Sequence, residues 1–498
     1  MEKILPTILA LAFIMCMFIP SNAQKNARNV DINVQRVSNK QRKTDSLRRH
    51  FYLYSHFRKI SIEQGITTFD SLAFIDWKKS TEAQAALDKY EIRRDSLRQV
   101  KVAEQKRDGL AKIASARNAT NKEEETYLDL SYCDLEEIPD FVYEFTNLKT
   151  LVLKNNRISE LPKRLKKLTN LKIINLSGNH LDLQKVKIKK NKTITTLALL
   201  DNNLDKVPKQ VKRLKGLKEI NLSGNEFERI PTKLGRIKSL RAIKLNDNPL
   251  NIYDQPLTKL KRIEKLRLNK CGLGQVPLGV FALNNLKELQ FSGNQISHIP
   301  EGIGNLKQLE SLSFYNNDIN VLPDAFYELT NLKNVDLYYN SIERVSPAIS
   351  NLQNLKIIYL SHNRLYALPE NIGEIAGLQK LYLHYNRLSS VPESIGDLKN
   401  LKVLRLNNNY FTEFPNQILR LTELEDLDIA VNEISILPEE LVKLEKLKLF
   451  FLQRNPIAFE AEANGHLEDM VAQMRERGAV VNYSKKESEE EEEEVIDQ

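Results

Sequence analysis

The sequence predicts an α/β solenoid, in which short repeats stack side by side and their strands form one parallel sheet. Three observations carry this prediction. The pattern L-x-x-L-x-L-x-x-N-x-L-x-x-x-P-x-x-I recurs, and each copy starts 23 residues after the previous one. The fourth and sixth positions of every copy are apolar, and the ninth is nearly always Asn. A single repeat cannot bury such an apolar face alone, but stacked repeats share one continuous core.

The repeats fill residues 123–460 as 15 units with one constant period. They start at Glu125, Leu148, Leu171, Ile194, Leu217, Leu240, Ile263, Leu286, Leu309, Leu332, Leu355, Leu378, Leu401, Leu424 and Leu447. Because no unit changes the spacing, equivalent positions of successive units can lie side by side along the whole segment.

The first half of each unit alternates, as in Leu381 and Leu383 with Tyr382 and His384 beside them. Alternation predicts a strand with one buried and one exposed face. No unit breaks either apolar column. We therefore expect one parallel strand from each unit.

The ninth position holds Asn in 13 units, and Cys133 and Cys271 fill it in the other two. A buried Asn must hydrogen-bond its amide, and the available partners are backbone groups of the adjacent turn. We expect these side chains to hold the chain as it leaves each strand. The two cysteines lie six units apart, about 29 Å at ~4.8 Å per strand, which is too far for a disulfide within one chain. We interpret them as core residues that replace Asn.

The second half of each unit starts with Pro in 11 of the 15 units and continues with apolar residues three apart. This pattern predicts a short helical turn or 3₁₀ segment on the convex side. We expect the convex side to be least regular where Lys185, Asp254, Ser346 and Ala461 replace that Pro.

These units resemble the leucine-rich repeat family in its 23-residue form, with L-P-x-x-I-x-x-L in the second half. Ras-group and bacterial exported leucine-rich repeat proteins share that form. The resemblance covers about two thirds of the chain. It implies a horseshoe with the parallel sheet on its concave face. It does not indicate which partner is bound, because members of the family bind many unrelated partners.

Residues 1–23 are predicted to be a secretory signal peptide. Lys3 precedes an apolar run from Ile8 to Ile19, and a small residue, Ala23, ends the segment. The apolar run is too short to span a membrane comfortably. We expect cleavage near Ala23 and export of a periplasmic or secreted protein. The lack of cysteine-rich caps favours a bacterial origin. No later segment is long and apolar enough to span a membrane.

Residues 24–122 are predicted to form a basic helical region. Residues 25–122 hold 22 Lys or Arg against 11 Asp or Glu, a net charge of about +11. Residues 81 to about 117 contain no Pro and are rich in helix-forming residues, which predicts one long helix. We expect this region to cap the first repeat, and a separate partner-binding helical module is the alternative. The charge is typical of solvated helices, and the alternative is binding to an anionic polymer or membrane surface.

Residues 461–483 are predicted to form a C-terminal cap. Gly465 to Gly478 has the pattern of an amphipathic helix, and Ala479 to Tyr483 has the pattern of a final strand. Residues 484–498 follow as an acidic tail, since Glu487 to Glu494 contains seven Glu and one Ser. Such a run cannot bury apolar surface, so we expect a disordered, solvated tail.

The concave face carries an aromatic cluster in units nine to twelve. The third, fifth, seventh and eighth positions of each unit point out of the sheet or lie on its rim. Most units have small or amide residues there, whereas these four have Tyr and His. Tyr combines apolar area with a hydroxyl and is enriched at binding hot spots. The predicted partner-binding residues are Tyr315, Tyr338, Tyr339, Tyr359, His362, Tyr382, His384, Tyr385, Arg405 and Asp428. The alternative is that Tyr suits strands and packs on its cross-strand neighbours.

Sequence motifs for catalysis are lacking. There is no glycine loop with Lys for phosphate, no Gly-x-Ser-x-Gly element and no zinc-spaced His/Cys cluster. We predict a non-enzymatic protein without metal or cofactor that binds a protein or glycan, and not nucleic acid, on its concave face. One alternative is an envelope scaffold that the basic N-terminal helices tether to an anionic surface. A remote alternative is an enzyme with an unrecognised site in residues 25–122.

Overall fold

The computed structural model describes residues 80–459 and 465–483. The chain divides into two compact units, Met1–Glu104 and Gln105–Gln498. Of the first unit, residues 80–104 are described, and they form the start of the helix α4 (Thr81–Asn118). The predictions about the signal peptide, the region before residue 80, Ala461 and the acidic tail lie outside the described residues.

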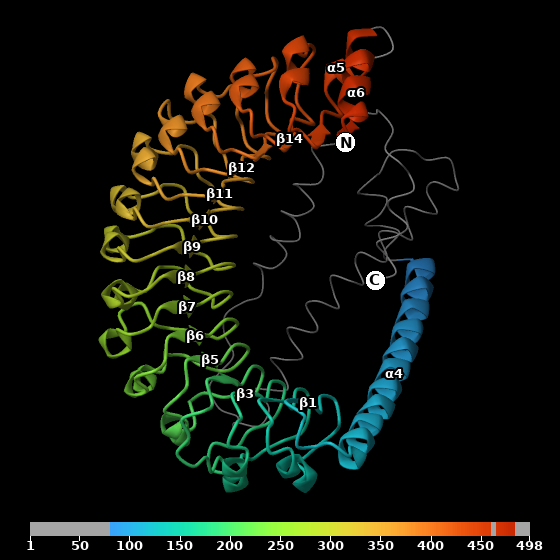
Figure 1. Ribbon diagram of the computed structural model, residues 1–498, viewed down its shortest axis with the longest axis vertical. Helices are drawn as coiled ribbons and strands as arrows, with labels where there is room; N and C mark the ends of the chain where they lie inside the picture. Colours follow the sequence, from blue (N-terminus) through green and yellow to red (C-terminus); the bar gives the residue numbers. More distant parts are fainter. Residues whose placement is uncertain (1–79, 460–464, 484–498) are drawn as a thin grey trace. The chain divides into compact units, whose positions relative to one another are not determined.

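The second unit is built on a parallel sheet. Its described part has 16 strands that pair in chain order. The pairing joins equivalent positions of successive repeats, so that Leu381 lies opposite Leu404. The strands are β1 (Tyr127–Asp129), β2 (Thr150–Val152), β3 (Ile173–Asn175), β4 (Thr196–Ala198), β5 (Glu219–Asn221), β6 (Ala242–Lys244), β7 (Lys265–Arg267), β8 (Glu288–Gln290), β9 (Ser311–Ser313), β10 (Asn334–Asp336), β11 (Ile357–Tyr359), β12 (Lys380–Tyr382), β13 (Val403–Arg405), β14 (Asp426–Asp428), β15 (Leu449–Phe451) and β16 (Val480–Asn482). Figure 1 shows the strands on the inner side of the curved stack of repeats. The predicted α/β solenoid with a parallel sheet on its concave face is confirmed.

The convex side carries short 3₁₀ helices, as predicted. They are η1 (Asp140–Glu144), η2 (Lys163–Lys167), η3 (Lys209–Arg213), η4 (Thr232–Arg236), η5 (Thr258–Leu260), η6 (Leu278–Ala282), η7 (Glu301–Asn305), η8 (Asp324–Glu328), η9 (Pro347–Asn351), η10 (Ile372–Glu374), η11 (Glu393–Asp397), η12 (Asn416–Arg420) and η13 (Glu439–Lys443). Most begin directly after the Pro of the repeat, whose fixed φ suits the start of a helical turn.

The predicted irregularities of the convex side are found at two of the four positions. The unit with Lys185 has isolated bridges, such as Leu161 to Val186, in place of a 3₁₀ helix. The unit with Asp254 has only the three residues of η5. The prediction is wrong for Ser346, because η9 has five residues. The Ser346 side chain accepts a hydrogen bond from the backbone N–H of Ala348, and thus caps the helix where Pro stands in other units.

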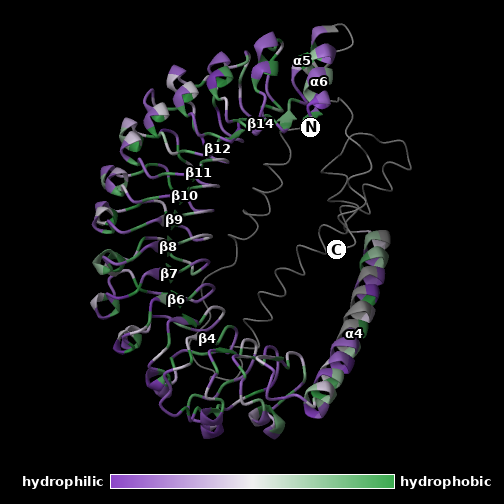
Figure 2. Ribbon diagram, viewed as in Figure 1, coloured by the Kyte–Doolittle hydropathy of each residue, from purple (hydrophilic) through white to green (hydrophobic). Residues whose placement is uncertain are grey.

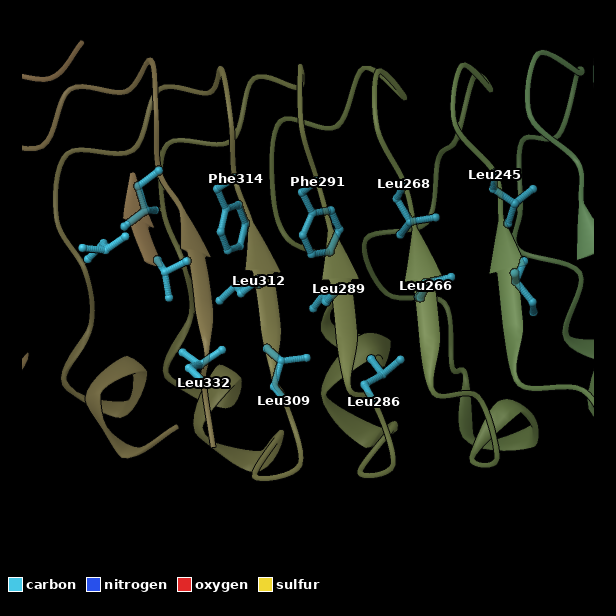
Figure 3. Packing of buried hydrophobic residues seen from close by; sticks show 14 of the residues in the cluster. Leu245, Leu266, Leu268, Leu286, Leu289, Phe291, Leu309, Leu312, Phe314 and Leu332 are labelled. Atoms are coloured by element: carbon cyan, nitrogen blue, oxygen red, sulfur yellow. The ribbon is translucent and has the colours of Figure 1, made fainter. Parts of the chain in front are cut away.

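The core lies between the sheet and the 3₁₀ helices. Leu and Ile of each unit lie over the same positions of the next, and Figure 3 shows this stacking from Leu245 to Leu332. Phe291 and Phe314 replace the usual aliphatic residue in two neighbouring units and stack with ring centroids 5.3 Å apart. Hydrophobic and hydrophilic residues alternate along the repeats in Figure 2. Each unit therefore buries one face against its neighbours.

The Asn of the ninth position is buried and fully hydrogen-bonded, as predicted. Asn225 is representative. Its Nδ2 donates to the carbonyls of Leu199 in the previous repeat (2.8 Å) and of Leu222 in its own (2.9 Å). Its Oδ1 accepts the N–H groups of Asn202 (3.0 Å) and Leu204 (2.9 Å). Each Asn thus binds its own turn and the turn of the preceding repeat.

The two cysteines are buried and free. The Sγ of Cys271 donates to the carbonyl of Leu245 at 3.2 Å, in the place where an Asn amide would donate. Burial raises the pKa of the Cys271 thiol to about 12. These observations support the interpretation of the cysteines as core replacements for Asn.

The helix predicted from residue 81 to about 117 is α4, and its last turns contact the first repeat. The carbonyl of Gly109 accepts a hydrogen bond from the Sγ of Cys133 at 3.4 Å. A Cβ on Gly109 would lie 2.4 Å from the carbonyl oxygen of Tyr132, so only glycine permits this approach. The guanidinium of Arg117 lies 5.8 Å from the ring of Phe141. These contacts support the proposed cap.

The described C-terminal segment adds two helices and a strand. α5 (Pro456–Phe459) follows β15, and α6 (Gly465–Glu476) lies where the sequence predicted an amphipathic helix. β16 pairs with β15, with Val481 opposite Phe450. Met470 and Met474 of α6 are buried in the core. This segment therefore covers the last repeat and extends its sheet by one strand.

Candidate functional site

The structure brings the eight predicted aromatic residues together on the concave face. They come from strands β11 and β12 and from the turns that follow β9 to β12. We call them the aromatic patch, which consists of Tyr315, Tyr338, Tyr339, Tyr359, His362, Tyr382, His384 and Tyr385. Each belongs to the fifth, seventh or eighth position of its unit, and the apolar fourth and sixth positions point into the core.

Rings from the same position of neighbouring units stack on one another. At the fifth position, the centroids of Tyr359 and Tyr382 lie 4.6 Å apart with nearly parallel rings. At the eighth position, His362 stacks on Tyr339 and on Tyr385, each at 4.1 Å. Tyr315 and Tyr338 form a third stacked pair at the seventh position, 5.7 Å apart.

Edge contacts join these stacks into one cluster. Tyr338 meets Tyr339 at 4.6 Å with the rings nearly perpendicular. His384 lies 6.5 Å from Tyr382 and 5.6 Å from Tyr338, and so connects the fifth and seventh positions. Tyr315, Tyr339 and Tyr385 keep 38%, 42% and 47% of their surface exposed. The patch is therefore packed inside and open to solvent along its rim.

The backbone of the eighth position has the left-handed conformation in all 15 units, with φ between 51° and 67°. Gly, Asn and Asp adopt this conformation at the lowest cost, and they fill the position in eight units, for example Asn155 and Gly178. Three successive units have Tyr339, His362 and Tyr385 there instead. These three residues were predicted to bind a partner, but their left-handed backbone was not predicted. The signal in the sequence was the loss of Gly, Asn and Asp from this column.

Both histidines of the patch are held in the neutral form. Burial, and then the neighbouring His362 and Arg405, lower the pKa of His384 to about 4. Burial also lowers the pKa of His362. The Nδ1 of His384 shares a hydrogen bond of 2.7 Å with the hydroxyl of the buried Ser361. Burial raises the pKa of Tyr338 to about 12, so its hydroxyl is also neutral.

Arg405 and Asp428 lie beside the patch and are engaged with each other. The guanidinium of Arg405 contacts Asp428 at 2.9 Å and Asp426 at 2.6 Å. It also lies 5.1 Å from the centroid of the Phe451 ring. Partner binding by Arg405 and Asp428 stays a prediction; in the structure Arg405 lies opposite Tyr382 in the sheet and is paired with the two carboxylates.

A hollow of about 480 Å³ lies at the other edge of the patch. It is lined by Gln290, Ser292, Ser311, Leu312, Ser313, Tyr315, Asn334, Val335, Asp336, Ile357 and Tyr359. The hollow exists because Ser311 and Ser313 are small at the third and fifth positions of β9, whereas β11 places Tyr359 at the fifth position. Ser313 and Asp336 were not among the predicted site residues. The available signal was Ser at both outward-facing positions of one strand, Ser311 and Ser313, close to the aromatic residues.

The described residues offer no other evident chemical centre. Within residues 80–459 and 465–483, no three His, Cys, Asp or Glu side chains gather in a way that could hold a metal ion. Over the same ranges, no helix has the length and apolar character needed to cross a membrane. The aromatic patch and the adjoining hollow are therefore the candidate site.

Solved structures with the same fold come from bacteria and animals. A leucine-rich repeat protein from Leptospira interrogans is 26% identical, with a TM-score of 0.59, and the match covers 74% of this chain and 98% of that one. A chain of the Drosophila Toll–Spatzle complex is 25% identical, with a TM-score of 0.54, over 68% of this chain and 48% of that one. An internalin from Listeria monocytogenes is 18% identical, with a TM-score of 0.50, over 75% and 93%, and shows the fold alone.

Comparison with curated protein sequences finds no match. Two family descriptions match the repeats. The one for the leucine rich repeat matches residues 126–181, 192–250 and 261–319. The one for a leucine-rich repeat region matches residues 339–476. Together with the 16-stranded parallel sheet, these matches show that the chain belongs to the leucine-rich repeat family.

Proposed function

We propose that this protein is an exported, non-enzymatic binding protein that holds a macromolecular partner, a protein segment or a glycan, on the aromatic patch. The fold supports a binding role, and the Toll–Spatzle structure is an example in which a protein of this fold occurs in a complex. The observation that carries the proposal is the run of Tyr339, His362 and Tyr385 in left-handed backbone.

That run carries backbone strain that Gly would avoid. A residue other than Gly in this conformation costs about 1–2 kcal/mol, so the three residues together cost about 3–6 kcal/mol. Their two stacked pairs contribute about 0.5–1.5 kcal/mol each beyond area burial, and further ring contacts with Tyr315, Tyr338 and His384 offset more of the strain. The strained run is therefore held by the other rings of the aromatic patch. Strain of this kind is typical of functional sites.

The alternative reading, that Tyr simply suits strands, applies to only part of the patch. Tyr359 and Tyr382 lie within β11 and β12 and pack on each other across the sheet. Tyr339, His362 and Tyr385 lie after the strands end, where strand propensity has no bearing. We therefore assign the eighth-position residues to partner binding. We assign the fifth-position residues Tyr359 and Tyr382 to both packing and binding.

The test is affinity capture from the envelope and surroundings of the organism that makes the protein. The bait is the mature chain, residues 24–498, beside the variant Tyr359→Ala/Tyr382→Ala/His384→Ala. A second variant, Tyr253→Ala/Tyr410→Ala, removes exposed tyrosines outside the patch and is the matched control. A partner retained by the parent and the control and lost by the triple variant supports the proposal. Equal retention by all three would refute binding by the patch.

A second candidate function is attachment to an anionic surface, and one observation favours it. Lys189, Lys190, Lys212, Arg213 and Lys215 together line a hollow of about 420 Å³ on the outer side of the third and fourth repeats. In the described part of the chain, no carboxylate lies within 4.0 Å of these five cations. The basic helical region predicted over residues 24–122 would add to this charge. Attachment by charge weakens sharply at high ionic strength, whereas binding by the aromatic patch changes little.

Export is part of the proposal and has its own measurement. The support is the sequence pattern of residues 1–23. The intact mass of the protein isolated from its source is expected to correspond to a chain that begins at Gln24. A full-length mass would contradict cleavage. The expectation that the protein binds no nucleic acid stays a prediction, because the fold by itself does not decide the class of partner.

A further inference from the structure

Asp336 is a half-buried carboxylate at the floor of the hollow beside the aromatic patch. Its two oxygens accept hydrogen bonds from neutral donors. The N–H of Tyr338 donates to Oδ1 at 3.2 Å, and the hydroxyl of Ser313 donates to Oδ2 at 3.0 Å. The hydroxyl of Ser292 lies 3.0 Å from that of Ser313 and continues the hydrogen-bonded chain across β8 and β9. The carboxylate is thus fixed in place with its charge uncompensated.

Asp336 differs in this respect from the other carboxylates of the concave face. Six acidic residues occupy the third or fifth position of the described strands: Asp129, Glu219, Glu288, Asp336, Asp426 and Asp428. Five of them have a Lys or Arg nitrogen within 4.0 Å, as in the pairs of Glu288 with Arg267 at 2.6 Å and of Asp428 with Arg405 at 2.9 Å. Among the described residues, no cation lies that close to Asp336. Within the described residues, each of these carboxylates except Asp336 therefore has a cationic partner, which for Asp129 is Lys112 of α4 and for the others is a residue of the sheet.

The walls of the hollow suit a cation with an apolar stem. Tyr315 and Tyr359 line it on two sides, and their rings are held by stacking on Tyr338 and Tyr382. Tyr359 lies opposite Asp336 in the pairing of β10 with β11, and burial and then the charge of Asp336 raise the pKa of Tyr359. Burial also raises the pKa of Asp336 itself. Ring faces attract cations, and the methylene stem of a long basic side chain packs on apolar surface.

We infer that the hollow receives a Lys or Arg side chain of a polypeptide bound on the concave face. Its ammonium or guanidinium group pairs with Asp336, and its stem lies against Tyr315 and Tyr359. This inference rests on the proposed function, and it identifies a basic side chain as the group of the partner that this site recognises. A polypeptide fits better than a glycan, because a sugar amine lacks the flexible stem that these two rings would contact.

The experiment is selection of a random peptide library on four immobilised forms of the mature protein. They are the parent, Asp336→Asn, Glu310→Gln and the triple alanine variant of the patch. Asn keeps the size of Asp336: its Oδ1 can accept the N–H of Tyr338, and its Nδ2 can donate to the hydroxyl oxygen of Ser313, so Asp336→Asn removes the charge and reverses one hydrogen bond. Glu310→Gln removes one charge from the neighbouring repeat at an exposed pair with Lys333, and serves as the matched control.

The parent and Glu310→Gln are expected to select peptides enriched in Lys or Arg at one position. Asp336→Asn is expected to select peptides without that enrichment and to bind the parent's best peptide about 10-fold to 100-fold more weakly. Replacement of the selected basic residue by norleucine should weaken binding to the parent but not to Asp336→Asn. Unchanged enrichment on Asp336→Asn would overturn the inference and leave the proposed function standing. Failure of the parent to select any peptide would overturn the inference and leave binding of a glycan by the patch standing. Equal selection by the triple variant would overturn peptide binding by the patch, and the inference with it.

Discussion

Asn225 offers a direct test of what holds the repeats together. Asn225→Ala removes an amide that joins two repeats through backbone groups. Three of those groups, the N–H of Asn202, the N–H of Leu204 and the carbonyl of Leu199, have no other hydrogen bond in the described structure. The carbonyl of Leu222 keeps a second donor, the Nδ2 of Asn248 at 3.0 Å.

The expected loss of stability follows from those three backbone groups. A buried backbone group left without a partner costs about 1–3 kcal/mol. Asn225 is only 3% exposed, so water reaches the site poorly in the intact fold. A water molecule that enters the space of the lost amide would hydrogen-bond to some of these three groups and reduce the loss. We therefore expect Asn225→Ala to lower the free energy of opening of these repeats by about 3–5 kcal/mol.

Native-state hydrogen exchange of residues 196–227, read by mass spectrometry, measures that free energy locally. Local measurement matters because stacked repeats need not unfold in one step. The matched control is Asn331→Ala, which removes an exposed amide that donates one hydrogen bond to the carbonyl of Lys307. We expect the control to lose less than about 1 kcal/mol. A loss below about 1 kcal/mol for Asn225→Ala would refute the view that the Asn column stabilises the stack.

Three further predictions concern strain, pH and reactivity. Val431 is a β-branched residue at φ 55°, which strains its backbone. Val431→Asn is therefore expected to raise the free energy of unfolding in urea by about 1 kcal/mol, whereas the control Val431→Thr is not. A decrease in that free energy with Asn would show that the strain is absent. The pKa of His384 is about 4 in the folded protein and about 6.5 in the unfolded chain, so the stability it contributes is present above pH 6.5 and is lost as the pH falls towards 4. The drop in melting temperature between pH 7.5 and 4.5 should therefore be smaller in His384→Gln, and an identical drop would contradict the shift. The Cys271 thiol, with a pKa of about 12, should resist iodoacetamide at pH 7.5 until urea is added, and rapid labelling of the folded protein would contradict its burial.

Much of the candidate site could be predicted from the sequence, because the constant repeat period shows which residues lie side by side in the sheet. Residues 23 apart lie on adjacent strands, so Tyr359 and Tyr382 were predicted to be neighbours and they stack at 4.6 Å. The same rule placed Tyr339 beside His362, and their ring centroids lie 4.1 Å apart. No such rule tells which groups remain unpaired. Arg405 was predicted to face a partner, and it is engaged by Asp426 and Asp428 on the next strand.

On the convex side, the residue at the Pro position did not by itself predict whether a 3₁₀ helix forms. Loss of Pro predicted irregularity at both Lys185 and Ser346. Only the unit with Lys185 lacks its 3₁₀ helix, because the Ser346 hydroxyl caps η9 where the Lys185 side chain has no equivalent acceptor. Whether a turn forms depends on the hydrogen bonds available to its first residues, which a motif with one Pro column does not record.

The sequence by itself determined the strands, their order, their register and the Asn column. Each of these depends on contacts between a unit and its immediate neighbour, and those contacts repeat at one fixed spacing. Only the tertiary structure showed that the eighth position is left-handed, that Ser311 and Ser313 leave a hollow, and that no cation of the described residues lies within 4.0 Å of Asp336. These features depend on backbone conformation and on the exact reach of side chains from three or four strands at once. A linear pattern encodes which residues are neighbours, whereas the packed structure decides which of their charges and hydrogen bonds are left for a partner.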